Sequence, residues 1–172
     1  LELGGKVVTM SDSSGWIHDP AGIDREKLDW IMDLKNNRRG RISEYADHFD
    51  GAIFTKSQPE PASNGLWGVD VDVALPCATQ NEINEEEAKM LVSNTVIAVA
   101  EGANMPCTPE AVEVFQSNGV LFAPGKASNA GGVATSGLEM SQNSLRMSWT
   151  REEVDAHLHR IMVNIHKNAY DT

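Results

Sequence analysis

Residues 69–123 read VDVDVALPCATQNEINEEEAKMLVSNTVIAVAEGANMPCTPEAVEVFQSNGVLFA, and this stretch decides the fold class. Short β-branched runs at residues 69–75, 96–100 and 120–123 alternate with two longer segments that have a helical pattern. Such alternation is typical of a parallel sheet that is covered by helices on both faces. The sequence therefore predicts an α/β fold with a doubly wound, mostly parallel sheet.

The residues before this stretch extend the same pattern. Further β-branched runs occur at residues 6–10 and 51–55, and apolar residues at helical spacing mark residues 24–37. Residues 56–68, which are rich in proline and glycine, predict a surface loop. We therefore expect two more strands in the sheet, separated by a helix.

Helix starts are marked by local signals. Asn84, Thr108 and Thr150 each precede a helical pattern and suit the N-cap position. Glu87 and Glu153 lie three residues after two of these caps, which is the spacing of a capping box. These signals predict three well-bounded helices, and we expect the last, within residues 148–172, to pack outside the sheet.

Composition limits the class of protein. A length of 172 residues suits a single domain with a real core. The 14 basic and 25 acidic side chains give a formal charge of -11, which disfavours nucleic acid and anionic lipid as partners. No apolar run of membrane-spanning length and no leader pattern occur, so we expect a cytoplasmic protein without a membrane segment.

The two cysteines, Cys77 and Cys107, are too few for a zinc site or a disulfide framework. The histidines of the last predicted helix lack the spacing of a metal pair. We therefore expect free, buried thiols and no metal site.

Four polar loops follow predicted strands, at residues 11–15, 76–81, 101–104 and 124–132. Ligands of open parallel sheets bind beyond the carboxyl ends of the strands. Hydroxyls, carboxamides and glycines in these loops suit ribose hydroxyls and an amide-bearing ring. Each loop taken alone also fits an ordinary turn, so the prediction of a dinucleotide site depends on all four together.

No G-x-G-x-x-G motif is present, although a dinucleotide-binding fold normally has one after its first strand. Either the fold is a different one, or the first strand and its glycine-rich turn lie upstream of Leu1. We expect the second, a Rossmann-like fold that lacks its first strand. Residues 6–10 would then form the second strand, whose end faces the adenosine ribose.

The residues after this strand bear on the choice of cofactor. Asp12 alone favours NAD, because a carboxylate binds the ribose diol. Ser11 and Ser13 add hydroxyl donors, and a basic cluster follows the next helix. The cluster comprises Lys35, Arg38 and Arg41. A 2′-phosphate needs such donors, so NADP is favoured over NAD, although a solvated helix end would also suit the cluster.

The strings SDSSG (11–15), ALPCATQNE (74–82), AEGANMP (100–106) and APGK through GGVATSGLEMSQN (123–143) resemble those of hexameric bacterial glutamate dehydrogenases. The similarity runs from end to end. Four long strings in the same order are more specific than a short glycine pattern.

The resemblance implies interconversion of L-glutamate with 2-oxoglutarate and ammonia, using NADP(H). Carried over by position, the implied cofactor-binding residues are Ser11, Asp12, Ser13, Lys35, Arg38, Thr79, Gln80, Asn81, Asn104 and Asn129. The implied substrate-binding residues are Gly131, Gly132, Val133 and Ser136, with the Ser136 hydroxyl donating to the γ-carboxylate.

The sequence also departs from the family. The catalytic lysine and aspartate of the family belong to an amino-terminal domain without a counterpart here, so no catalytic residue is assigned. We expect residues 1–172 to form a single cofactor-binding domain, inactive alone, of a protein that is a homohexamer at full length. Dehydrogenases for leucine, phenylalanine or valine belong to the same class. The alternative is a non-catalytic regulatory module that binds a nucleotide or an amino acid.

Overall fold

The computed structural model describes residues 1–57 and 65–171. The chain forms two compact units, Leu1–Trp67 and Gly68–Thr172, and each is described by itself. Residues 58–64 of the predicted surface loop lie outside the described residues. Of the rest of that loop, Lys56 ends a strand and Leu66–Gly68 forms the 3-10 turn η2.

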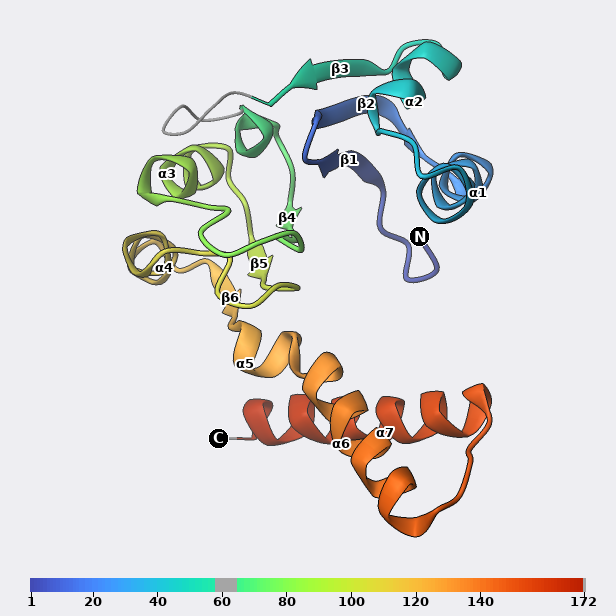
Figure 1. Cartoon of the computed structure of the whole chain (residues 1–172). Helices are drawn as coiled ribbons and strands as arrows, with labels where there is room; N and C mark the ends of the chain where they lie inside the picture. Colours follow the sequence, from blue (N-terminus) through green and yellow to red (C-terminus); the bar gives the residue numbers. More distant parts are fainter. Residues whose placement is uncertain (58–64, 172) are drawn as a thin grey trace. The chain divides into compact units, whose positions relative to one another are not determined.

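The first unit contains an antiparallel sheet, which differs from the parallel arrangement predicted for this part. Its strands are β1 (Val7–Asp12), β2 (Gly15–Ile23) and β3 (Ile53–Lys56), in the order β1-β2-β3 (Figure 1). The sequence predicted β1 and β3 but missed β2, which pairs with both. A side chain at Gly15 would collide with the Thr55 carbonyl oxygen, so glycine allows the close approach of β2 and β3.

Helices cover the core of this unit. Helix α1 (Arg25–Asp33) continues into the π-helical turn η1 (Leu34–Arg38), and α2 (Ser43–His48) follows. The core side chains come from β2, α1 and α2 and from the residue that precedes α2. They are Ile17, Ile23, Ile31, Ile42 and Tyr45.

The second unit contains the predicted parallel sheet. Strands β4 (Val73–Ala74), β5 (Ala98–Ala100) and β6 (Leu121–Ala123) pair in parallel in that order. Helices α3 (Glu85–Ser93) and α4 (Pro109–Ser117) connect them and pack against each other (Figure 1). The α/β class is therefore confirmed, with three parallel strands rather than five.

The predicted helix caps are confirmed. Asn84 and Glu87 form a capping box with two bonds of 3.0 Å, and the Thr108 hydroxyl accepts the first-turn N–H of Ala111 at 3.3 Å. Thr150 and Glu153 form a second capping box. Local side-chain to backbone bonds thus fix these helix starts, because they satisfy N–H groups that lack helical partners.

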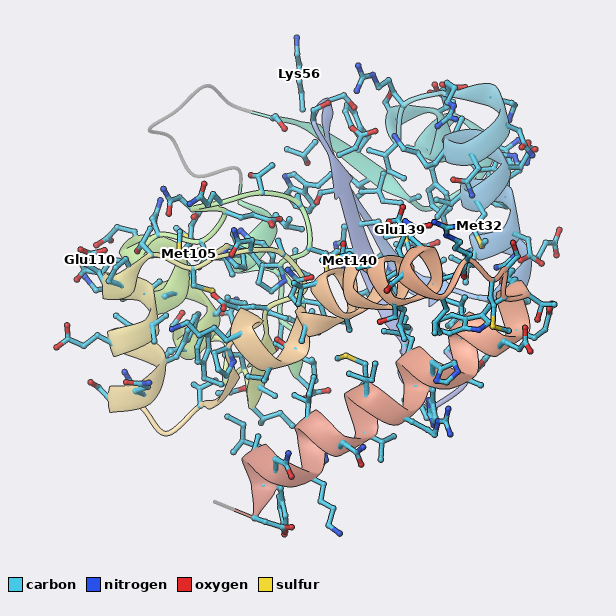
Figure 2. The ribbon with its side chains drawn as sticks, turned by 60° about the horizontal axis from the view of Figure 1, so that its bottom comes forward. Met32, Lys56, Met105, Glu110, Glu139 and Met140 are labelled. Carbon is cyan, nitrogen blue, oxygen red and sulfur yellow. The ribbon has the colours of Figure 1, made fainter. Side chains whose placement is uncertain are left out.

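Three helices end the chain: α5 (Gly125–Ser128), α6 (Ala130–Leu145) and α7 (Arg151–Tyr170). Helix α7 packs on α6, and a side chain at Gly131 would meet Met162 and Leu158 of α7. Met140 of α6 is 72% exposed (Figure 2). In the described part of the chain, no helix is both long and apolar enough to cross a membrane.

Candidate functional site

Three of the four segments predicted as loops leave the same edge of the parallel sheet, because β4, β5 and β6 run in one direction. The prediction of a loop is wrong for residues 124–132, which form α5 and the start of α6. Backbone bonds link the loops directly. Gly102 N and Ala103 N donate to the Pro76 carbonyl at 2.9 and 3.2 Å, and Asn81 N donates to the Met105 carbonyl at 3.0 Å. The loops after β4 and β5 therefore form one connected surface.

Exposed polar side chains cover this surface. Thr79, Gln80, Asn81 and Asn104 are exposed, and Asn129 is half-buried at the carboxyl end of α5. Asn81 has a left-handed backbone with φ 56°, a conformation that asparagine tolerates well. Hydroxyl and carboxamide groups of this kind can donate to and accept from a sugar or an amide. The arrangement suits recognition of a polar ligand.

Glu101 lies beneath the surface and joins its parts. The residue is 6% exposed, and its Oε1 accepts from Cys107 N at 3.2 Å while Oε2 accepts from Gly125 N at 2.6 Å. Its carbonyl oxygen accepts from the Ser128 hydroxyl at 2.6 Å. One residue thus connects the loop after β5 to the turn between β6 and α5. This role of Glu101 was not predicted from the sequence.

The two thiols are not poised for reaction. Partial desolvation by neighbouring atoms raises the pKa of Cys77, with the Glu82 carboxylate adding to the effect. Burial raises the pKa of Cys107, and the adjacent Glu101 carboxylate raises it further. Both are free, but only Cys107 is buried, so the prediction of burial is wrong for Cys77. Thiols with raised pKa values stay protonated at neutral pH and react slowly.

The predicted substrate residues lie on the first two turns of α6. Ser136 and Val133 are exposed, and the Ser136 hydroxyl donates to the Gly132 carbonyl one turn earlier at 3.3 Å. Gly131 faces α7. These residues are therefore presented by a helix rather than by a loop, and the Ser136 hydroxyl could donate to a ligand only by turning away from the Gly132 carbonyl.

The fourth predicted loop is the β1–β2 hairpin of the first unit, so it does not end a parallel strand as expected. It contains what we call the Asp12 cluster, which consists of Asp12, Ser13, Ser14, Lys35 and Arg41. The Asp12 carboxylate accepts from Ser14 N at 2.8 Å, Lys35 Nζ at 2.7 Å and Ile42 N at 2.9 Å. The hairpin is thereby tied to residues that follow α1.

Burial alone would raise the pKa of Asp12, but the Lys35 ammonium, the Ser14 hydroxyl and two backbone N–H groups outweigh it. Together they hold the pKa of that carboxyl well below its usual range. Asp12 is therefore ionised at neutral pH, with its oxygens occupied by internal donors. This leaves it poorly suited to a ribose diol, which needs a carboxylate that accepts from the ligand.

The positive charge at this hairpin comes from Lys35 and Arg41. The Arg41 guanidinium is exposed and donates to the Ser13 hydroxyl at 2.7 Å. Arg38 lies apart, because it pairs with Asp33 at 2.8 Å and stacks 4.5 Å from the Trp30 ring. Of the residues predicted to recognise the 2′ position, the Asp12 cluster thus contains Asp12, Ser13, Lys35 and Arg41, but not Arg38. Ser11 sits in β1 opposite Trp16.

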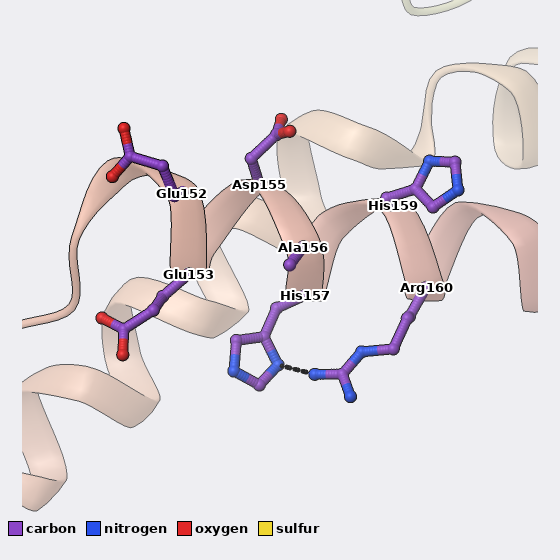
Figure 3. A pocket seen from close by; sticks show the side chains of 7 residues that line it. All are labelled: Glu152, Glu153, Asp155, Ala156, His157, His159 and Arg160. Carbon is purple, nitrogen blue, oxygen red and sulfur yellow. Dashed lines mark hydrogen bonds between the residues drawn. The ribbon is translucent and has the colours of Figure 1, made fainter.

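A separate depression lies along α7 (Figure 3), where the His157 and Arg160 side chains are 2.8 Å apart. All of its lining residues belong to this one helix, and none was predicted as a site residue. Across residues 1–57 and 65–171, no three histidine, cysteine or acidic side chains converge in a way that could hold a metal ion.

Comparison with known proteins places these features in a family. Residues 1–172 match the family described as Glutamate/Leucine/Phenylalanine/Valine dehydrogenase. The chain belongs to this dehydrogenase family. It is 61% identical over 169 residues to an NAD(P)-specific glutamate dehydrogenase of Xylanibacter ruminicola, and this match covers 98% of the chain and 36% of the relative.

Two further glutamate dehydrogenases are also similar to this chain. An NADP-specific glutamate dehydrogenase of Escherichia coli is 54% identical over 166 residues, which cover 96% of the chain and 36% of that protein. The crystal structure of a Plasmodium falciparum glutamate dehydrogenase has a TM-score of 0.83 at 47% identity, over 95% of the chain and 34% of that structure. The chain therefore spans about a third of the length of the glutamate dehydrogenases that it resembles.

Proposed function

We propose that this chain forms the cofactor-binding part of a glutamate dehydrogenase that uses NADP(H). The full enzyme would interconvert L-glutamate with 2-oxoglutarate and ammonia, and residues outside this chain would carry the proton transfers. On this proposal the 172 residues alone bind cofactor without turning over substrate. The single-domain assignment, a homohexameric full-length enzyme and a cytoplasmic location belong to the same proposal.

The main support for the proposal is the set of polar side chains at one edge of the parallel sheet. The loops that bear Thr79, Asn81 and Asn104, and the short helix α5 that ends at Asn129, leave one edge of the parallel sheet, in a chain whose whole length matches the family. Their exposed hydroxyl and carboxamide groups match the donors and acceptors of a ribose and a carboxamide. Gln80, next to Thr79, belongs to the same set. NADP(H), when bound, supplies the hydride chemistry that these side chains lack.

The Asp12 cluster supports NADP(H) over NAD(H). A 2′-phosphate is dianionic near neutral pH and binds best to a guanidinium with adjacent hydroxyl donors. Arg41 and Ser13 provide both, at 2.7 Å from each other. Lys35 adds positive charge but is partly neutralised by Asp12. Asp12 therefore shapes the hairpin, and Arg41 is the main phosphate ligand on this proposal.

Glutamate rather than an apolar amino acid is the proposed substrate. Gly131, Gly132, Val133 and Ser136 would line the side of the pocket that receives the γ-carboxylate. The exposed Ser136 hydroxyl can turn from the Gly132 carbonyl to donate to a carboxylate, whereas a leucine or valine side chain would offer it no polar partner.

The alternative is a regulatory module that binds a nucleotide or an amino acid without catalysis. The family match favours an enzyme, since the relatives reported above are named glutamate dehydrogenases. A chimera distinguishes the enzyme from the regulatory module. In it, this chain replaces the 166 aligned residues of the Escherichia coli relative. Restored oxidation of glutamate supports the enzyme, and a folded but inactive chimera supports the module.

The cofactor assignment is tested by titrating the chain with NADPH and NADH while following nicotinamide fluorescence. We expect Arg41→Ala to weaken NADPH by about tenfold and NADH by less than about twofold, because only NADPH loses a phosphate partner. Arg38→Ala is the matched control, since Arg38 already pairs with Asp33. Equal losses for both cofactors in Arg41→Ala would remove the cluster from the phosphate site.

The substrate assignment is tested in the chimera. Ser136→Ala is expected to raise the KM for glutamate by roughly tenfold, because the γ-carboxylate loses a donor, and to spare the KM for NADP. Ser141→Ala is the control, because its hydroxyl makes the same one-turn bond in α6, to Gly137 at 2.9 Å. An unchanged glutamate KM in Ser136→Ala would exclude Ser136 from the pocket.

A further inference from the structure

We propose that Glu101 is the positioning residue of the nicotinamide half of the site. Its buried carboxylate sets the places of the three carboxamides Asn81, Asn104 and Asn129 without touching the cofactor itself. The inference rests on the proposed function, and it adds a residue to which no binding role has been assigned above.

The two oxygens of Glu101 have separate tasks. Oε1 accepts from Cys107 N, which closes the turn that carries Asn104, and Oε2 accepts from Gly125 N, at the start of α5. Gly125 lies 24 residues from Glu101 along the chain. A Cβ at Gly125 would lie 2.9 Å from the Ala103 carbonyl oxygen and 3.2 Å from Oε2, so the approach depends on glycine.

The first bond governs two of the carboxamides. The turn from Asn104 to Cys107 is held at one end by Glu101. Met105, which is labelled in Figure 2, lies in this turn and has a left-handed backbone with φ 52°. A non-glycine residue rarely adopts this conformation without support. The Met105 carbonyl in turn accepts from Asn81 N at 3.0 Å, so a shift of the turn moves both Asn104 and Asn81.

The second bond governs the third carboxamide. Helix α5 has only four residues, Gly125–Ser128, and Asn129 is its C-cap. Glu101 binds both ends of this short helix, through Oε2 to Gly125 N and through its carbonyl to the Ser128 hydroxyl at 2.6 Å. The place of Asn129 therefore depends on Glu101.

Glu87 shows what a buried glutamate with only a local role does. It is also 6% exposed and also accepts a backbone N–H, from Asn84 at 3.0 Å. That bond caps α3 within three residues. Glu87 thus matches Glu101 in burial and chemistry but joins no separate loops.

Glu101→Gln should separate positioning from mere folding. Glutamine keeps one oxygen, and its NH2 group must then face one of the two N–H donors, so one connection is lost whichever way the amide turns. The test uses the full chain and two ligands: NADPH, and adenosine 2′,5′-bisphosphate, which has the phosphorylated adenosine half but no nicotinamide.

We expect Glu101→Gln to weaken NADPH by about tenfold and to leave the bisphosphate within about twofold. Hydrogen exchange at the Cys107 and Gly125 amides should also become faster by roughly tenfold or more, as these amides lose their acceptor. Glu87→Gln should change neither measurement. Cys107→Ala, which keeps both backbone bonds, should leave NADPH affinity within about twofold.

Glu101→Asp is a second variant in case the glutamine protein does not fold. It keeps the charge, but its shorter side chain cannot reach both donors, so NADPH should weaken by about threefold or more while the bisphosphate does not.

Unchanged NADPH affinity, or equal weakening of both ligands, in the folded Glu101 variants would overturn the inference. If the unsubstituted chain binds neither ligand, the proposed function fails and the inference fails with it. If the unsubstituted chain binds both ligands, and the Glu101 variants bind them as well as Glu87→Gln does, only the inference about Glu101 fails.

Discussion

The two units use buried or partly buried carboxylates in different ways to hold distant segments. In the first unit, Asp12 and Asp19 bind the ammonium groups of Lys35 and Lys27, at 2.7 and 2.6 Å. In the second unit, Glu101 binds backbone N–H groups of two loops. The first unit therefore depends on paired charges, whereas the second depends on the shape of its backbone.

Removal of a buried negative charge from the first unit should reduce stability the most. Asp19 is 1% exposed, and its carboxylate also accepts from Tyr45 Oη at 2.6 Å. Asp19→Asn should lower the free energy of unfolding by about 3 kcal/mol, because the Lys27 ammonium loses its counter-charge in a buried place. Urea unfolding measures the loss.

The control for this change is Asp33→Asn, which breaks the exposed pair with Arg38. Its effect should be far smaller than that of Asp19→Asn, as expected of a surface ion pair. A similar loss in both variants would show that burial of the Asp19–Lys27 pair does not matter.

A substitution at Gly125 should disturb the backbone of the second unit. Gly125→Ala places a Cβ against the Ala103 carbonyl oxygen and should lower the free energy of unfolding by about 1–2 kcal/mol. Gly137→Ala, in an open part of α6, should instead raise it by about 0.5–1 kcal/mol, because alanine favours a helix. Thermal unfolding of both variants decides this. Stabilisation by Gly125→Ala would contradict the tight contact.

The stability of the two units should also respond differently to pH. The pKa of Asp12 and that of Asp19 are lowered on folding, so the stability they contribute is present above their usual pKa, near 3.8, and is lost as pH falls below it. Burial raises the pKa of Glu82 above 4.5, so protonation of Glu82 favours folding as pH falls.

Acidification to about pH 3.5 should therefore speed hydrogen exchange of β1 and β2, after correction for intrinsic rates, more than that of β4 and β5. The free energy of opening should fall by about 1 kcal/mol more in the first sheet than in the second. This is the smallest of the three effects, because Lys35 is partly exposed. Matched losses in both sheets would refute the contrast.

Local features of the structure were predictable from the sequence. Asn84, Thr108 and Thr150 cap helices through bonds to residues three positions away, so a short window of sequence contains the whole interaction. The strands of the parallel sheet were predicted because β-branched runs alternate with helical patterns. The prediction of β4 was too long, since only Val73–Ala74 pair.

Long-range features were not predictable. Strand β2 contains Asp19, Pro20 and Gly22, which resemble turn signals, and its strand character comes from pairing with β1 and β3. The bonds of Asp12 to Lys35 and Ile42 span 23 and 30 residues, and that of Glu101 to Gly125 spans 24. Arg38 was assigned to the phosphate site because sequence does not show that Trp30 and Asp33 hold it elsewhere.

We propose that the segments that follow β4, β5 and β6 bind NADP(H). Amide chemical shifts of the 15N-labelled chain, followed during titration with NADPH, test this proposal. We expect saturable shifts at Thr79, Asn81, Asn104 and Asn129, and little change along α7. Shifts confined to the α7 depression, or an absence of shifts at these four residues, would refute it.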